Sequence, residues 1–373
     1  MASSRSYSFL LFSVLLSSAG TTVTSASCSR ADREALREFQ SGLSDPYIGI
    51  FTSWTGEDCC AHWYGVSCDP STGRVADLTL RGESEDPILT RAGRSGLMTG
   101  RISPAICRLD RLSNLIIADW KQISGPIPSC ITSLASLRIL DLVGNRLSGP
   151  LPANLGKLSH LTVLNVADNQ ISAQIPKSIT QISGLMHLNL ASNHISGDIP
   201  SDLGNLKMLS RALLGRNQIS GKIPPSISYM NRLADLDLAE NQLWGSIPAF
   251  FGSMPVLSSL YLDSNRLSGL IPPEILGSKG LGILNLSRNE LTGLIADVFT
   301  SRTYFTALDL SYNKLTGDVP KTLSKATFVG HLDLSHNHLC GRIPAGLPFD
   351  HLEAASFASN DCLCGWPLQA CRS

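Results

Sequence analysis

Leucines recur along this chain in a short alternating pattern that is repeated every 24 residues. Within each unit the order is Leu-x-x-Leu-x-Leu-x-x-Asn-x-Leu-x-Gly-x-Ile-Pro, and residues 137–152 form one copy. The Leu-x-Leu core has period two, which predicts a short strand whose leucines point inward and whose polar residues point outward. A single unit cannot bury its leucines alone. Successive units are therefore expected to stack as parallel strands in a solenoid.

An asparagine follows each predicted strand at an unbroken interval of 24 residues. The nine positions are Asn145, Asn169, Asn193, Asn217, Asn241, Asn265, Asn289, Asn313 and Asn337. Inside a stack, each amide is expected to bond backbone groups of neighbouring coils that would otherwise be buried and unpaired, at roughly 1–3 kcal/mol each. We therefore interpret the asparagines as scaffold. The glycine that follows permits a left-handed turn, and the Ile-Pro pair predicts an extended segment and no full helix.

The pattern predicts eleven strands, of which the first two belong to irregular units. The strands begin near Val75, Leu112, Leu137, Leu161, Leu185, Leu209, Leu233, Leu257, Leu281, Phe305 and Val329. A charged insertion, residues 81–111, separates the first two strands. The second unit carries one extra residue, with Trp120 or Lys121 where asparagine is expected. Terminal repeats of solenoids are often atypical, so we interpret these features as distortion, with a special site as the alternative.

Residues 1–26 have the pattern of a secretory signal peptide. Arg5 precedes an apolar run at residues 9–16, and small residues follow up to Ala26. The run is too short to span a bilayer, so the pattern predicts cleavage after Ala26 and export. A plastid transit peptide is the alternative, but it should be richer in serine and arginine. No other apolar stretch of about 20 residues occurs, so we expect no membrane span.

Ten cysteines agree with export, because structural disulfides persist in oxidising compartments. Four lie before the repeats and four after them, where the end leucines of a solenoid need small caps stabilised by disulfides. The other two occupy nearly the same place in adjacent coils. The spacing lacks the Cys-x-x-Cys pairs of metal sites. We predict the bridges Cys28–Cys59, Cys60–Cys68, Cys107–Cys130, Cys340–Cys362 and Cys364–Cys371.

Charge and motif content restrict the classes of function. The chain has 30 basic and 30 acidic residues, and removing residues 1–26 deletes only Arg5, which leaves 29 against 30 and a net charge of −1. No basic stripe occurs, which argues against nucleic-acid binding. No kinase signature, nucleophile–base pairing or phosphate-binding glycine loop is evident. We therefore predict a monomeric protein that is not an enzyme and needs no cofactor.

Several motifs resemble those of plant extracellular leucine-rich repeat (LRR) proteins. Trp54, Asp58-Cys59-Cys60 and residues 63–69 resemble the plant-type N-terminal cap, and the Leu-Ser-Gly-x-Ile-Pro units resemble the plant extracellular repeat class. The paired cysteines at both ends look like those of the polygalacturonase-inhibiting proteins. Residues 80–86, 91–96 and 348–354 look like the plant LRR proteins named for DNA-damage repair or toleration. The resemblance covers essentially the whole mature chain.

The periodicity and this resemblance together predict the fold class and its domains. We expect an α/β solenoid, a curved LRR horseshoe with a parallel concave sheet, about eleven repeats of 24 residues and a disulfide cap at each end. The predicted domains are a signal peptide at 1–26, an N-terminal cap at 27–72, repeats at 73–339 and a C-terminal cap at 340–373.

The outward positions of the strands form the candidate binding surface. The middle outward positions are Thr79, Ile116, Asp141, Asn165, Asn189, Leu213, Asp237, Tyr261, Asn285, Asp309 and Asp333. Tyrosine and arginine, which are enriched at binding hot spots, concentrate in the later repeats. The candidate partner-binding residues are Arg211, Arg216, Asp235, Asp237, Tyr261, Asp263, Arg288, Asp309 and Tyr312. The alternative is ordinary exposed ion pairing, of Arg211 with Asp235 and of Arg216 with Glu240.

Two further motifs raise a metal hypothesis and a glycosylation hypothesis. His331, Asp333, His336 and His338 cluster in the last repeat, but no third strong ligand with fixed geometry is evident, so we predict no metal site. Asn285-Leu286-Ser287 is the only Asn-x-Ser/Thr sequon. In an exported protein it predicts a glycan at Asn285, and an unused sequon is the alternative.

The function expected from these patterns is protein binding. The leading hypothesis is a secreted, non-enzymatic protein of the plant cell wall or apoplast that binds a protein partner on its concave face, with a role in defence or stress response. The partner is an extracellular enzyme, a receptor ectodomain or a peptide. The resemblance implies two alternatives, an inhibitor of microbial polygalacturonase and a DNA-damage repair or toleration factor.

Overall fold

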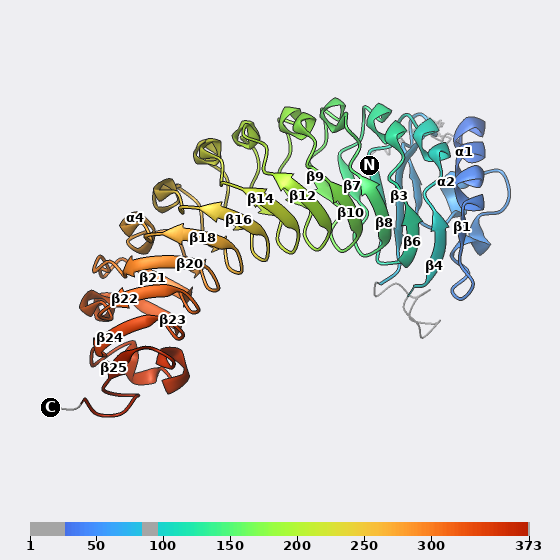
Figure 1. Cartoon of the computed structure of the whole chain (residues 1–373). Helices are drawn as coiled ribbons and strands as arrows, with labels where there is room; N and C mark the ends of the chain where they lie inside the picture. The colour runs from blue at the N-terminus through green and yellow to red at the C-terminus, as the bar shows by residue number, and fades with distance from the viewer. Residues whose placement is uncertain (1–26, 84–95, 372–373) are drawn as a thin grey trace, which may run out of the picture.

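The computed structural model describes residues 27–83 and 96–371, and these residues form a curved solenoid. The coils follow one another along an arc, with the N-terminal helix at one end and the C-terminal cap at the other (Figure 1). The predicted signal peptide and residues 84–95 of the charged insertion lie outside the described residues. The fold prediction is confirmed, and the parallel strands begin where the leucine pattern places them.

A parallel sheet of eleven strands lines the concave face, and one antiparallel strand of the N-terminal cap, β2 (Val66–Cys68), adds a twelfth. The leucines at the alternate positions are buried, and they form one continuous core. The parallel strands are β3 (Val75–Arg81), β5 (Asn114–Ala118), β7 (Ile139–Asp141), β9 (Val163–Asn165), β11 (His187–Asn189), β13 (Arg211–Leu213), β15 (Asp235–Asp237), β17 (Ser259–Tyr261), β19 (Ile283–Asn285), β21 (Tyr304–Asp309) and β23 (Phe328–Asp333).

A second sheet runs along the solenoid, and the sequence analysis did not predict it. It has thirteen strands, built mainly from the Leu-x-Gly segments that follow each asparagine. Its strands are β1 (Leu43–Ser44), β4 (Met98–Arg101), β6 (Lys121–Gly125), β8 (Arg146–Pro150), β10 (Gln170–Ala173), β12 (His194–Asp198), β14 (Gln218–Gly221), β16 (Gln242–Gly245), β18 (Arg266–Gly269), β20 (Glu290–Leu294), β22 (Lys314–Gly317), β24 (His338–Arg342) and β25 (Cys362–Cys364).

Short helices, mostly of the 3₁₀ type, return the chain from the second sheet to the concave one. Because even a narrow helix needs more room than a strand, the stack curves toward the strand side. The helices are α1 (Arg30–Ser41), η1 (Ile50–Ser53), α2 (Cys59–His62), η2 (Pro104–Arg108), η3 (Ser129–Ser133), η4 (Leu155–Lys157), η5 (Lys177–Gln181), η6 (Leu203–Asn205), η7 (Pro225–Tyr229), η8 (Ala249–Ser253), α4 (Pro273–Leu276), η9 (Lys321–Lys325), η10 (Phe349–His351) and η11 (Ala354–Phe357).

The asparagine ladder bonds neighbouring coils as predicted. Asn241, for example, donates from Nδ2 to the carbonyl of Leu214 in the preceding coil at 3.0 Å and to two carbonyls of its own coil. Its Oδ1 accepts the amide of Ile219 at 2.9 Å. Each amide therefore satisfies several backbone groups at once, which is why one residue type recurs here.

Other residues take over the ladder at its two ends. Trp120, and not Lys121, fills the asparagine place in the second unit, because its buried indole donates to the carbonyl of Leu80 at 3.0 Å. Asn360 continues the ladder into the C-terminal cap, where its amide bonds Leu334 and Leu339. The sequence analysis missed Asn360 because it lies 23 residues after Asn337 instead of 24.

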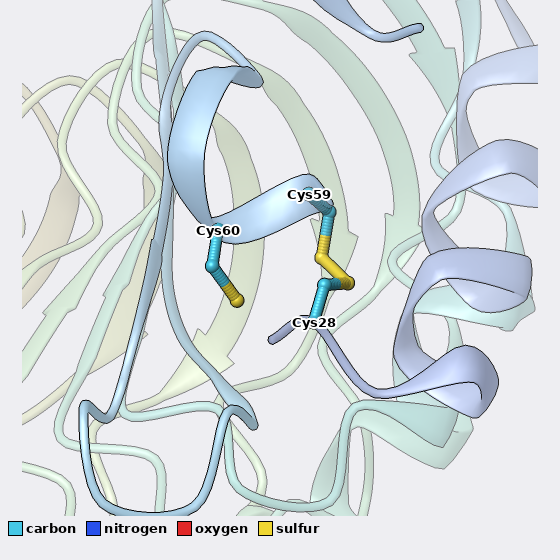
Figure 2. A group of neighbouring side chains, drawn as sticks. All are labelled: Cys28, Cys59 and Cys60. Carbon is cyan, nitrogen blue, oxygen red and sulfur yellow. A yellow bond between two sulfur atoms is a disulfide. The ribbon is translucent and has the colours of Figure 1, made fainter. Parts of the chain in front are cut away.

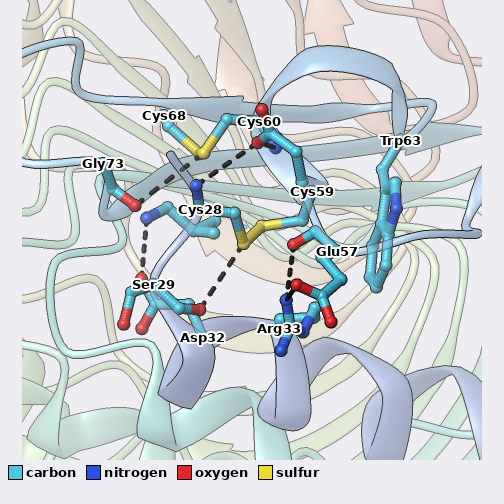
Figure 3. Close-up of a disulfide and its surroundings, with 12 residues drawn as sticks. Cys28, Ser29, Asp32, Arg33, Glu57, Cys59, Cys60, Trp63, Cys68 and Gly73 are labelled. Atoms are coloured by element: carbon cyan, nitrogen blue, oxygen red, sulfur yellow. Dashed lines mark hydrogen bonds and ion pairs between the residues drawn. A yellow bond between two sulfur atoms is a disulfide. The ribbon is translucent and has the colours of Figure 1, made fainter. Parts of the chain in front are cut away.

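Five disulfides join the ten cysteines in the predicted pairs. Figure 2 shows the Cys28–Cys59 bridge of the N-terminal cap, with the side chain of the adjacent Cys60 pointing away from Cys59. Cys60 bonds Cys68 instead. The surrounding contacts fix the cap to the first coil (Figure 3). There the buried carboxylate of Asp32 accepts from Arg74 at 2.8 Å and from the amide of Val75 at 2.9 Å.

Candidate functional site

Outward side chains of the concave strands line up in columns that cross the coils. Strand register pairs Leu213 with Asp237, Asp237 with Tyr261, and Tyr261 with Asn285, so the predicted middle column is confirmed. Neighbouring members of a column lie about 4.8 Å apart, the spacing of paired strands. We call this set the middle column. It begins at Thr79 and ends at Asp333.

A second row of side chains lies at the turn that ends each concave strand. The residue before each ladder asparagine adopts a left-handed backbone, and most of these residues are not glycine. A left-handed non-glycine residue costs about 1–3 kcal/mol, and the stack holds it in place. We call this row the turn column. Its non-glycine members from the fourth coil onward are Asp168, Ser192, Arg216, Glu240, Ser264, Arg288, Tyr312 and His336.

The two predicted cross-coil ion pairs are present. Arg211 Nε lies 3.1 Å from a carboxylate oxygen of Asp235, and Arg216 Nε lies 2.9 Å from one of Glu240. All four side chains contact solvent, so each pair contributes well under about 1 kcal/mol to stability. The pairs orient the arginines along the coils. They also reduce the free charge that these arginines offer to a partner.

Asp263 is the most perturbed acid on the concave face. Burial, and then the nearby charges of Asp237, Glu240 and Asp309, raise its pKa to about 6. The equivalent position is Ala239 in the preceding coil and Ser287 in the following one, so Asp263 places a carboxylate where its neighbours are small. Burial also raises the pKa of Asp237. No sequence pattern predicted these shifts, because they depend on how deeply each carboxylate lies.

An aromatic and cationic stack occupies the later turn column. The guanidinium of Arg288 lies 4.1 Å from the ring centroid of Tyr312, and Tyr312 stacks on His336 with centroids 3.9 Å apart. The sequence analysis named Arg288 and Tyr312 as candidates but did not predict the stack. The three residues each precede a ladder asparagine, and that shared spacing is the signal that was available. The candidate residues therefore form two groups. One contains Arg211, Asp237 and Tyr261, and the other is the stack of Arg288 and Tyr312 with His336.

The earlier coils present a smoother concave face. The position two residues after the middle column holds the small or apolar residues Val143, Ala167 and Ala191. A shallow hollow of about 140 Å³ lies across β9, β11 and β13, and it reaches from Val163 to Arg211. This half of the face offers fewer charged groups than the half from β13 to β21.

The first coils hold a separate charged cluster. Arg81 pairs with Asp141 at 3.1 Å, and Lys121 pairs with Glu83. Burial, followed by the charge of Glu83, raises the pKa of Asp119. Residues 84–95 of the insertion, which follow Glu83, lie outside the described residues.

The histidines of the last coil contact different groups. His336 stacks on Tyr312, and Nδ1 of His338 lies 3.1 Å from a carboxylate oxygen of Asp361. In the part of the chain that the structure describes, one group has the ligand spacing of a metal site, the sulfurs of Cys28, Cys59 and Cys60. Figure 2 shows these three residues. Their sulfurs belong to the Cys28–Cys59 and Cys60–Cys68 disulfides, so they are not the thiolates that metal ions bind.

The second sheet carries its own exposed aromatic group. The indole of Trp244 is half exposed, and the ammonium of Lys222 lies 4.9 Å from its ring centroid. This pair has the same chemistry as the concave candidates but lies on another face. Among residues 27–83 and 96–371, no helix has the length and apolar character needed to cross a bilayer.

Family models match both the cap and the repeats of this chain. The leucine rich repeat N-terminal domain matches residues 29–69, and leucine rich repeat models match residues 135–195, 256–277 and 279–339. An asparagine-laddered stack with disulfide caps defines the class as a repeat scaffold of the extracellular type. The chain is a plant leucine-rich repeat protein.

Curated relatives match parts of the chain. DNA damage-repair/toleration protein DRT100 of Arabidopsis thaliana is 60% identical over 121 residues, which are 32% of this chain and 32% of that protein. A polygalacturonase inhibitor of Vitis vinifera is 32% identical over 132 residues, which are 35% of each chain. The matched segments thus span about a third of these relatives' own length.

Solved structures match most of the solenoid. The LRR ectodomain of the receptor kinase GASSHO1/SCHENGEN3 from Arabidopsis thaliana, in complex with CASPARIAN STRIP INTEGRITY FACTOR 2, superposes with a TM-score of 0.76 at 30% identity. The match covers 89% of this chain and 38% of that one. A plant ice-binding protein superposes with a TM-score of 0.71 at 28% identity, over 93% and 99% of the two chains.

Proposed function

We propose that this chain is a secreted, non-enzymatic protein of the plant cell wall that binds a protein or peptide partner on its concave face between β13 and β21. The observation that carries the proposal is the contrast between the two halves of that face. After β7, β9 and β11 the concave face holds the small or apolar side chains of Val143, Ala167 and Ala191, whereas the coils from β13 onward present tyrosine, arginine and carboxylates. Tyrosine buries a large area at low entropic cost, and arginine adds directional donors, so these residues are suited to anchor an interface.

The charges of this surface favour a partner with exposed lysine or arginine. Asp235 and Glu240 already have arginine partners. Asp237, Asp263 and Asp309 make no ion pair within the described part of the chain, so three carboxylates are free to meet a cation. The GASSHO1/SCHENGEN3 ectodomain, which matches this solenoid, was solved with a bound ligand protein. That precedent supports ligand binding as the role of the scaffold.

Paired substitutions on two faces test the proposal. Tyr261→Ala with Arg211→Ala is expected to weaken capture of a wall protein at least tenfold, or roughly 1.4 kcal/mol, while the fold stays intact. The matched control is Lys222→Ala with Trp244→Ala, which removes the same chemistry from the second sheet and should leave capture unchanged. The assay is quantitative pull-down from wall extracts with the purified chain. Equal recovery by the concave variant and the wild type would remove the concave site from consideration.

Inhibition of a microbial polygalacturonase is a second candidate, supported by the partial match to inhibitors of that enzyme. Adding the purified chain to such an enzyme, with the Tyr261→Ala/Arg211→Ala variant beside it, distinguishes inhibition from other binding. The DNA-damage role suggested by the DRT100 name is the third candidate. A fluorescent fusion addresses it directly, because retention in the nucleus or plastid would exclude the secreted role.

A further inference from the structure

The sequon at Asn285 lies on the concave face, in the middle column. Register places its Cα opposite Tyr261 on one side and Asp309 on the other. The side chain is half-buried, and it lies within the surface assigned above to a partner. A modification at this position would therefore change the shape of that surface.

The hydrogen bonds of Asn285 leave one atom available for modification. Its Oδ1 accepts from the amide of Ser287 at 3.0 Å and from the Ser287 hydroxyl at 2.7 Å. Its Nδ2 makes no hydrogen bond to any described residue. An N-linked sugar replaces a hydrogen on Nδ2 and keeps the carbonyl oxygen, so the folded strand accommodates the sugar without losing either of these bonds.

Other asparagines of the chain differ in this respect. Each ladder asparagine from Asn145 to Asn337 donates from Nδ2 to backbone carbonyls of the stack, as Asn241 does to three of them. In the middle column, Asn165 donates from Nδ2 to Asp141 at 2.9 Å. Asn189 resembles Asn285 most closely, since its Oδ1 accepts the amide of Ala191, but it lacks a hydroxyl residue at that position.

We propose that Asn285 carries an N-linked glycan that stands on the concave sheet and divides it. In the transfer step, Nδ2 attacks the anomeric carbon of a lipid-linked oligosaccharyl diphosphate. The new C–N bond replaces the C–O bond to the leaving diphosphate, and the displaced proton passes to a base of the transferring enzyme. The Ser287 side chain is only 5% exposed in the fold, so transfer precedes folding of this coil.

The glycan separates the two groups of candidate residues. Arg211, Asp237 and Tyr261 lie on one side of β19, and Tyr312 and His336 lie on the other, while Arg288 lies in the turn that follows β19 itself. This consequence rests on the proposed binding function, whereas the modification rests only on entry into the secretory pathway. The partner surface then reduces to β13–β17, bounded by the sugar at its C-terminal edge.

Intact-mass analysis of the full chain expressed in cultured plant cells, recovered from both the medium and the cell extract, tests the inference, before and after enzymatic removal of N-glycans. One glycan is expected on the wild type and on Asn189→Gln, and none on Asn285→Gln or Ser287→Ala. Ala191→Ser creates an equivalent sequon at Asn189 and should add a second glycan. Melting temperatures should agree within about 2 °C with and without the native glycan, because it displaces no hydrogen bond.

The Ala191→Ser variant distinguishes a failure of glycosylation at Asn285 from a failure of the chain to enter the secretory pathway. If Asn189 is modified in that variant while Asn285 stays bare, the inference is wrong and the proposed binding function is unaffected. If neither is modified, the chain does not enter the glycosylating compartment, and the secretory part of the proposed function fails with the inference. Loss of more than about 5 °C on glycan removal would contradict the assignment of Nδ2 as a free position.

Discussion

The asparagine ladder and the concave columns run along the same coils, but their chemistry differs. In the ladder, one residue type recurs in nine successive units and bonds the backbone of the coil before it. In the middle column, isoleucine, aspartate, asparagine, leucine and tyrosine follow one another with no fixed order. The ladder positions are fixed by buried backbone groups that every coil shares. The columns meet solvent, so the stack places little constraint on their identity.

This difference shows where stability and binding reside in a solenoid. A ladder side chain satisfies several buried polar atoms, and its loss leaves them unpaired. A column side chain contacts water and one or two neighbours, so its loss costs the fold little. Stability and recognition are thus carried by different positions of the same 24-residue unit. The following predictions test that separation, beginning with the largest effect.

Reduction of the disulfides should have the largest effect, because the caps close the two ends of the ladder. The Cys28–Cys59 bridge closes a loop with a sequence separation of 31, and bridges of this kind contribute roughly 2–5 kcal/mol each. We expect full reduction to lower the melting temperature by more than 10 °C in thermal unfolding. Mild reduction should act first at Cys364–Cys371, because Cys371 is exposed near the end of the described chain. An unchanged melting temperature after full reduction would refute the capping role.

Substitution within the ladder should have the next largest effect. Asn241→Ala removes an amide that donates to three carbonyls and accepts one backbone amide, so we expect a loss of about 3 kcal/mol in the free energy of unfolding. Asn145→Ala should cost less, because its buried Oδ1 already has no partner in the described structure. Denaturant unfolding of both variants measures the difference, and equal losses would contradict it.

Much of this ladder could be predicted from the sequence, and its exceptions show why the rest could not. The 24-residue period identified nine asparagines, the eleven concave strands and the end caps. The sequence did not distinguish Trp120 from Lys121 as the ladder residue of the second unit. There an indole N–H takes the place of the asparagine amide, and whether it contacts the backbone carbonyl depends on the position of the ring. Asn360 broke the period by one residue. The second sheet was missed because Leu-Ser-Gly segments have no strong strand pattern of their own.

The candidate site was less predictable than the fold. Sequence spacing assigned each outward residue to its column, and it predicted the two ion pairs that the structure contains. It could not give the depth of Asp263, which sets the raised pKa of that carboxyl group. It also did not reveal that Arg288, Tyr312 and His336 stack, because stacking depends on the rotamers of three left-handed residues.

Substitution within the columns should affect binding and leave folding intact. The Tyr261→Ala/Arg211→Ala variant is expected to lose at least tenfold in capture, roughly 1.4 kcal/mol, with a melting temperature close to that of the wild type. Asn241→Ala should show the opposite behaviour when it is assayed below its own melting temperature, with lower stability and normal capture. Measuring both properties for both variants tests the separation. A column variant that unfolds as readily as the ladder variant would show that the two roles are not distinct.

The smallest expected effect concerns Asp263, a concave-face residue between the two columns that does carry a cost to the fold. Its pKa rises from an ordinary 3.8 to about 6, mainly through burial, so the native state holds its proton more tightly than the unfolded chain does. The fold therefore incurs no penalty below about pH 4, and the penalty grows between about pH 4 and pH 6 and is fully present above pH 6. A rise in the pKa from 3.8 to about 6 corresponds to a penalty of about 3 kcal/mol in the free energy of unfolding. Because the side chain still contacts solvent, we expect a penalty of about 1 kcal/mol.

Asp263→Ala removes that penalty and gives the site the small side chain found in the preceding coil. We expect the variant to unfold about 2 °C above the wild type at pH 7.5 and at the same temperature at pH 3.5. Ser311→Ala, at the equivalent position two coils later, removes no titratable group and is the control, which should show no such dependence on pH. A gain of equal size at both pH values would assign the effect to packing instead of charge. Loss of partner capture together with the gain in stability would show that Asp263 is retained for binding at the expense of the fold.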